Sequence, residues 1–166
     1  YKLNGGTLTP LINATPSNWN ITLTLTEGQQ NISIYANDTS TAKNQANKNV
    51  TIFVDLNNPT ISSLVCSSPV NDSVSVNCYI NSTDSFGLSS LIVGFNATGS
   101  WQNSSIISLS GKSQNYTYSI DAANTSLSNL KFSTLAYVSD LSGRTASSIF
   151  YDINITDDVF PTIWNI

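Results

Sequence analysis

Two cysteines are the side chains of this sequence with redox chemistry. Cys66 and Cys78 enclose the segment SSPVNDSVSVN, which carries a proline and an Asn-Asp pair near its middle. Two strands folded back about residue 72 would bring the sulfurs opposite each other, at a separation that a disulfide can span. We expect this disulfide, which would contribute about 2 to 3 kcal/mol by closing a short loop. A pair of buried free thiols is the alternative.

Carboxylates are the second group with potential chemistry. Most of the nine Asp residues come where strands are expected to end, and there an Asp usually accepts hydrogen bonds from the backbone of a turn. The alternative is a calcium site at a junction between domains, with oxygen ligands from Asp55 and Asn57, or from Asp157 and Asp158. Calcium is the only cofactor that the sequence suggests, and none is required.

Catalysis is not expected from this chain. It contains no His, which excludes a histidine general base and every triad that depends on one. Its serines lie outside any Gly-x-Ser-x-Gly motif, and no glycine-rich phosphate loop is present. Trp101 is a candidate for an exposed aromatic that stacks on sugar rings, whereas the pattern around Trp19 predicts a core position. We therefore expect no enzyme.

Asparagine carries the most specific spacing. The N-glycosylation motif Asn-x-Ser/Thr occurs about twice as often as the abundance of its residues would produce by chance. Its asparagines are Asn13, Asn20, Asn31, Asn37, Asn49, Asn71, Asn81, Asn96, Asn103, Asn115, Asn124 and Asn154. Several motifs overlap alternating strands, in which residues i and i+2 face outward together and the residue between them faces the core. We expect N-linked glycans at several of these sites, on an extracellular or cell-surface protein.

Composition excludes two classes of partner. Charged residues make up 10% of the 166, the net charge is −4, and the six basic side chains form no cluster. Neither nucleic acid nor an anionic membrane surface is therefore an expected partner. No apolar run approaches the roughly 20 residues that a membrane-spanning helix needs, so no membrane insertion is expected in this segment.

Apolar residues at every second position define the elements that would carry these groups. Between Asn31 and Ile61, two such runs at 32–36 and 50–54 predict a β-hairpin with one buried face. Seven residues of this stretch recur 102 positions later: Tyr35, Asp38, Ser40, Asp55, Pro59, Thr60 and Ile61 are matched by Tyr137, Asp140, Ser142, Asp157, Pro161, Thr162 and Ile163. The recurrence is an internal repeat whose period suits one β-sandwich domain.

The remaining pattern predicts an all-β chain. In the first part we expect short strands within 1–6 and 7–11 and a longer one at 19–26, before the hairpin. In the second part we expect strands near 60–66, 73–80, 90–96, 104–109, 114–121, 131–139 and 145–155. Residues 126–130 are the one place where a helical turn is allowed.

Several motifs of the first part occur together in one family. They are Tyr1-Lys-Leu-Asn-Gly5, Leu25-Thr-Glu-Gly28, Ile32-Ser-Ile-Tyr-Ala-Asn-Asp38, Val54-Asp55 and Pro59-Thr-Ile61. In this order they resemble the bacterial and archaeal immunoglobulin-like tandem repeats of large cell-surface proteins. The resemblance, closer for 1–61 than for the rest, implies immunoglobulin-like β-sandwich modules in tandem. Residues 1–58 would be the last strands of an incomplete module, 59–158 a complete module, and 159–166 the first strand of a following one.

The leading hypothesis for function is a structural module of a heavily N-glycosylated stalk, surface layer or pilus-like filament, with neighbouring modules as partners. The alternatives are a ligand-binding module of an adhesin, which would recognise a glycan or a neighbouring cell, and a non-catalytic domain of a secreted hydrolase. The incomplete first module raises a further alternative. The apolar end of the chain could be donated as a strand to the open sandwich of another copy, through Phe160, Ile163, Trp164 and Ile166. A window within a longer tandem array explains the same pattern.

Overall fold

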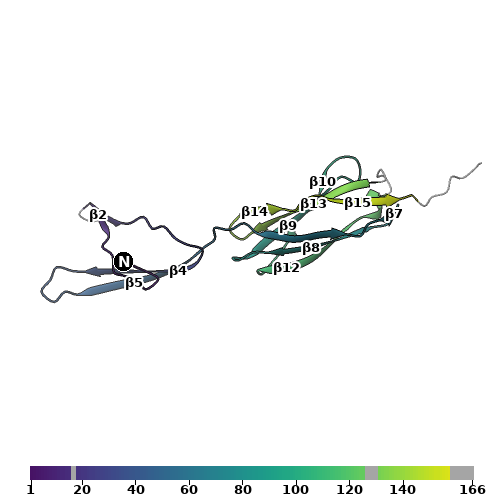
Figure 1. The fold of residues 1–166 in the computed structure, drawn as a ribbon. Helices are drawn as coiled ribbons and strands as arrows, with labels where there is room; N and C mark the ends of the chain where they lie inside the picture. Colours follow the sequence, from purple (N-terminus) through teal and green to yellow (C-terminus); the bar gives the residue numbers. More distant parts are fainter. Residues whose placement is uncertain (16–17, 126–130, 158–166) are drawn as a thin grey trace, which may run out of the picture. The chain divides into compact units, whose positions relative to one another are not determined.

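The computed structural model describes residues 1–15, 18–125 and 131–157, which form two compact units, Tyr1–Leu56 and Asn57–Ile166 (Figure 1). Both units are built from β-strands, as expected, and one short helix, α1 (Ala122–Thr125), is present among the described residues. No described helix has the length and apolar character needed to cross a membrane.

The first unit is organised by the predicted hairpin. Strands β4 (Gly28–Asn37) and β5 (Gln45–Val54) pair antiparallel along their whole length, from Gly28 opposite Val54 to Asn37 opposite Gln45. Strand β1 (Lys2–Leu3) pairs with the other edge of β4, which gives a three-stranded sheet in the order β1-β4-β5. Strands β2 (Ile12–Thr15) and β3 (Asn18–Asn20) form a separate two-stranded sheet.

Three expectations for the first unit are wrong. No strand forms within 7–11, and the strand expected at 19–26 ends at Asn20. Residues 21–26 still alternate between partial burial and exposure, but they have no ladder partner among the described residues. Trp19, expected in the core, is 56% exposed. The shared reason is that alternation selects a face, whereas burial of that face needs a second layer, and no described hydrophobic side chain of this unit is buried.

The second unit contains two sheets. One has the order β12-β8-β6, from β6 (Thr60–Cys66), β8 (Val76–Thr83) and β12 (Ser113–Ile120). The other has the order β10-β9-β13-β15-β7, and its strands are β7 (Val70–Asn71), β9 (Leu88–Phe95), β10 (Gln102–Asn103), β13 (Lys131–Asp140) and β15 (Tyr151–Thr156). Strand β11 (Ile107–Ser108) also pairs with β9, and β14 (Thr145–Ser147) with β13. All pairs are antiparallel except β15 with β7.

One hydrophobic core lies between these two sheets. Val76 and Ile80 contribute to it from one sheet, and Val93, Val138 and Ile153 from the other. Along β8 the buried and outward positions alternate, which is the period-two signal that predicts such strands. The second unit is therefore a two-layered β-sandwich, and its layers run along each other in Figure 1.

Expected and observed strands differ mainly at the sheet edges. The strand at 60–66 has the expected bounds, and that expected at 73–80 lies three residues later as β8. The strand expected at 104–109 is reduced to β11, and that at 145–155 is divided into β14 and β15. The helical turn lies at 122–125, directly before the segment where it was expected, and residues 126–130 are outside the described part.

Two serines explain how the short edge strands end. Ser104 donates its N–H to the carbonyl of Val93 (2.8 Å), and its hydroxyl accepts from the N–H of Val93 (3.0 Å). Ser148 repeats the arrangement on Ala136, at 2.8 and 2.9 Å. Because each hydroxyl replaces a backbone carbonyl, the edge strand stops without leaving a buried N–H of the central strand unpaired.

Candidate metal centre

Asp84 closes the turn between β8 and β9. Its Oδ1 accepts hydrogen bonds from the N–H groups of Phe86 (2.7 Å) and Gly87 (2.6 Å), and its own N–H donates to the carbonyl of Lys112 (2.9 Å). Gly87 is required here because its φ is +149° and a Cβ would lie 2.9 Å from the side chain of Leu141. The residue Asp84 is 7% exposed, and its buried Oδ2 has no hydrogen-bond partner.

Asp140 closes the loop after β13 in the same manner. Its Oδ1 accepts from the N–H of Ser142 (2.8 Å), the hydroxyl of Ser142 (2.7 Å) and the N–H of Arg144 (2.9 Å). The residue is 1% exposed, and its Oδ2 is likewise buried without a hydrogen-bond partner. In both residues one oxygen organises a loop and the other is left available.

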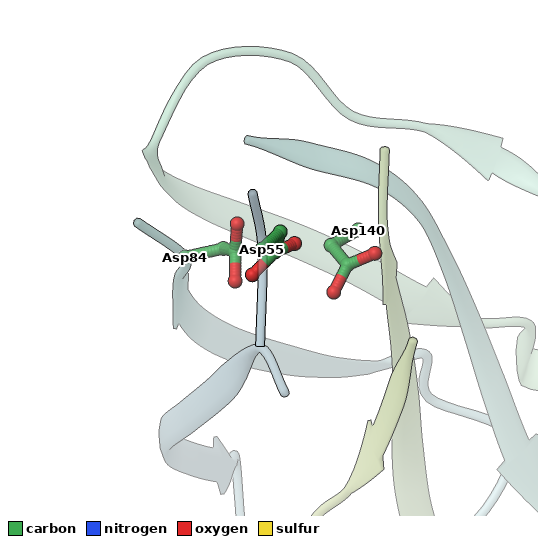
Figure 2. A group of neighbouring side chains, drawn as sticks. All are labelled: Asp55, Asp84 and Asp140. Atoms are coloured by element: carbon green, nitrogen blue, oxygen red, sulfur yellow. The ribbon is translucent and has the colours of Figure 1, made fainter. Parts of the chain in front are cut away.

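These two carboxylates belong to one end of the second unit, which we call the linker end. Thr60, where β6 begins, pairs with Thr83, the residue before Asp84, and Asp140 lies opposite Leu88 at the same end of the other sheet. Carboxylate oxygens of Asp84 and Asp140 lie within 4.8 Å of one another. Figure 2 draws both side chains, together with Asp55 from the end of the first unit.

The arrangement has the chemistry of a hard-cation site. Two carboxylates at such a separation repel each other by on the order of 3 kcal/mol at an effective dielectric constant near 20. Two oxygens bound to the same calcium ion, each at about 2.3–2.6 Å, lie no more than about 5 Å apart. A donor set of oxygens without His or Cys suits calcium or magnesium and does not suit zinc.

The sequence-predicted metal ligands lie in different places. Asp55 directly follows β5 at the end of the first unit, and Asn57 is exposed at the start of the second. Asp157 follows β15, whose Asn154 pairs with Lys131 at the start of β13, so Asp157 lies at the end of the unit opposite to Asp140. Asp158 is outside the described residues. The calcium prediction for these four residues remains a prediction.

The sequence did not point to Asp84 and Asp140 as a pair. Their place at strand ends predicts a role in turns, which is what Oδ1 of each does. The two residues are 56 positions apart, and the signal that joins them is topological. Strands β8 and β13 belong to different sheets and run toward the same end of the sandwich.

The predicted disulfide is present. Cys66 and Cys78 lie opposite each other on β6 and β8, and their sulfurs are bonded at 2.06 Å. Both residues belong to the core, where they are 4% and 0% exposed. The bond therefore links two adjacent strands of one sheet and has a structural position.

Most described acceptor asparagines are accessible. Those whose residues are exposed are Asn20, Asn31, Asn37, Asn49, Asn71, Asn103, Asn115 and Asn154. Asn81, Asn96 and Asn124 are half-buried, and the side chain of Asn13 is outside the described part. Ile155, between an acceptor and its Thr, is buried as the alternation predicts, whereas Val50 in the open first unit is 40% exposed. Asn154 therefore combines an exposed acceptor with a buried neighbour, as the alternation predicts.

An exposed aromatic pair lies on the second unit. Trp101 is 48% exposed, and its ring centroid lies 5.6 Å from that of Phe150. The indole approaches the backbone of Gly94 on β9, where a Cβ would lie 3.7 Å from the ring. The prediction that Trp101 is the accessible tryptophan is right for this residue, although Trp19 is exposed as well.

The residues predicted for strand donation, Phe160, Ile163, Trp164 and Ile166, lie outside the described residues, and that hypothesis stays a prediction. In comparisons with known proteins, the chain matches no protein-family model, and no curated protein resembles it significantly in sequence.

Proposed function

We propose that this chain is part of an extracellular structural protein, in which immunoglobulin-like β-sandwich modules in tandem carry a coat of N-linked glycans. The observation that carries the proposal is the exposure of most of its described acceptor asparagines. A glycan needs an amide that projects into solvent. The proposed work of the module is mechanical, and no catalytic role is proposed.

The strand order of the second unit supports the immunoglobulin-like assignment. An immunoglobulin sandwich places its strands A, B and E in one sheet and C, F and G in the other. The orders β6-β8-β12 and β9-β13-β15 have the same connectivity. The internal repeat supports the tandem arrangement, because Asp38 and Asp140 lie at the end of the strand that opens a hairpin, and each accepts hydrogen bonds from the loop.

The disulfide supports an extracellular location. Disulfides persist in oxidising compartments and are rare in the cytosol, and the Cys66–Cys78 bond belongs to the core of the sandwich. With a net charge of −4, the proposed partners are neighbouring modules and covalent glycans, and nucleic acid is not among them.

The glycans can be tested on material from the natural source. The chain has only six tryptic sites, so trypsin would give long peptides that carry several acceptors each. Chymotryptic peptides would therefore be analysed by mass spectrometry before and after removal of N-glycans. We expect sugar on exposed acceptors such as Asn49, Asn115 and Asn154. The variants N49Q, N115Q and N154Q should each lose one glycan, whereas N77Q should lose none, because Asn77 is exposed but has no motif. Unmodified peptides at all exposed acceptors would refute the glycoprotein proposal.

The aromatic pair favours a second candidate, a glycan-binding module of an adhesin. Aromatic rings that are open on one face can stack on sugar rings, and Trp101 with Phe150 offers such a surface. On a glycan array the wild-type chain and the W19A variant would bind the same sugar, and W101A would not. If the wild-type chain retains no glycan, or if W101A binds like wild type, the adhesin candidate fails and the structural proposal is unaffected.

A further inference from the structure

We propose that Asp84 and Asp140 bind one calcium ion at the linker end of the second unit. The proposal is independent of the glycans and of the extracellular role, because it rests on the geometry of the second unit.

The buried oxygens provide the first argument. An acidic residue that only closes a turn needs one acceptor oxygen for the backbone, and Oδ1 fills that role in both residues. A second carboxylate oxygen that is buried without a donor costs stability unless a cation compensates it. Here two such oxygens, from Asp84 and Asp140, belong to side chains more than nine-tenths buried. They therefore point to a ligand that is positively charged.

The separation of the oxygens provides the second argument. One carboxylate oxygen of Asp84 and one of Asp140 lie within 4.8 Å of each other, which agrees with two ligands of one calcium ion bound at about 2.3–2.6 Å. Their loops are fixed from both sides, since each Oδ1 is held by at least two hydrogen bonds. The two ligand atoms are thus positioned before an ion arrives, which lowers the entropy cost of binding it.

Asp84 and Asp140 each supply one carboxylate oxygen to the proposed site. Calcium takes six to eight oxygen ligands, and water and backbone carbonyls would complete its shell.

The test uses the full 166-residue chain with calcium as the probe. Isothermal titration should show one site, with a dissociation constant of about 0.1–1 mM, as in extracellular calcium modules. At a hundredfold excess over that constant, the melting temperature of the second unit should rise by about 10 °C. Each of the variants D84N and D140N should lose the binding and the temperature rise. A chain without saturable calcium binding would overturn the proposal.

A structural role alone makes a different prediction for the same variants. Asn keeps the Oδ1 acceptor that closes each loop and removes the negative charge. With a chelator in solution, D84N and D140N should therefore have melting temperatures equal to or above that of the wild type. With calcium in solution, their melting temperatures should lie below that of the wild type. If either variant is destabilised equally in both conditions, the carboxylate is only a loop residue and the metal site is wrong.

The matched control is Asp38. D38N changes an Asp with the same loop-closing bonds but with a hydrogen bond on its Oδ2, and it should leave calcium binding unchanged. Loss of binding in D38N would refute the assignment to the second unit.

Discussion

Asp38 in the first unit and Asp140 in the second occupy matching places in two hairpins, yet their carboxylates have different surroundings. Both accept from the N–H and hydroxyl of the serine two residues later, and both donate their own N–H across the loop. In the first loop, Asn44 also donates to Oδ2 of Asp38 at 2.9 Å. In the second loop, Oδ2 of Asp140 receives no hydrogen bond.

The difference in surroundings follows from the lengths of the two loops. The loop that Asp38 closes runs to residue 44, and the loop that Asp140 closes runs to residue 144 and is two residues shorter. The longer loop supplies its own donor for the second oxygen and lies exposed. The shorter one leaves that oxygen beside Asp84 inside the sandwich end. The same local sequence therefore closes a turn in one unit and offers a ligand atom in the other.

The largest contrast should appear in the core. Ile153 is fully buried, so I153A should lower the free energy of unfolding of the second unit by about 2–5 kcal/mol. Val50 is 40% exposed in the hairpin of the first unit, so V50A should lower the free energy of unfolding of that unit by less than about 1 kcal/mol. Hydrogen exchange followed by mass spectrometry in urea reports on each unit separately. Equal losses in the two units would contradict the contrast between an open sheet and a closed sandwich.

The disulfide should produce the next largest effect. Replacing both cysteines in C66A/C78A removes the cross-link between β6 and β8 and should destabilise the second unit by about 3 kcal/mol. Protection of the β4–β5 hairpin should remain as in the wild type. Reduction of the wild-type chain serves as the control and should reproduce the loss. If protection falls equally in the hairpin, the two units do not unfold independently.

A smaller effect is expected from the serines that end the edge strands. S148A should leave the N–H of Ala136 without its partner and cost about 1–2 kcal/mol. S147A is the matched control, because Ser147 is exposed on β14, and it should change stability by less than about 0.5 kcal/mol. Chemical denaturation of the wild type, S148A and S147A measures these changes in stability. Equal stability of S148A and S147A would show that the hydroxyl bond is dispensable.

The sequence predicted those features that depend on neighbouring residues. Alternation at 50–54 located the hairpin, and the spacing about residue 72 located the disulfide, because both are properties of adjacent strands. The burial of Trp19 was predicted wrongly because it depends on a second layer that alternation does not specify. The pair Asp84 and Asp140 was missed for a related reason. Its members meet only when two sheets are stacked. The sequence around either Asp therefore does not indicate that the other lies nearby.

The smallest expected effect concerns the titration of Asp38. The hydrogen bonds from the side chains of Ser40 and then Asn44 hold the pKa of this exposed carboxyl below its usual value of 3.8. NMR titration should show that S40A raises this pKa, and that N44A raises it less. Because the folded-state pKa is lowered, the carboxylate stabilises the loop at pH values above the unfolded-state pKa, and that contribution is lost as pH falls through the folded-state pKa.

N44A is the informative variant for the comparison of the two loops, because it removes the donor to Oδ2 and leaves Asp38 with the bonding pattern of Asp140. If N44A acquires no calcium site, the ligand role of Asp140 requires its buried neighbour Asp84 and does not follow from the loop alone.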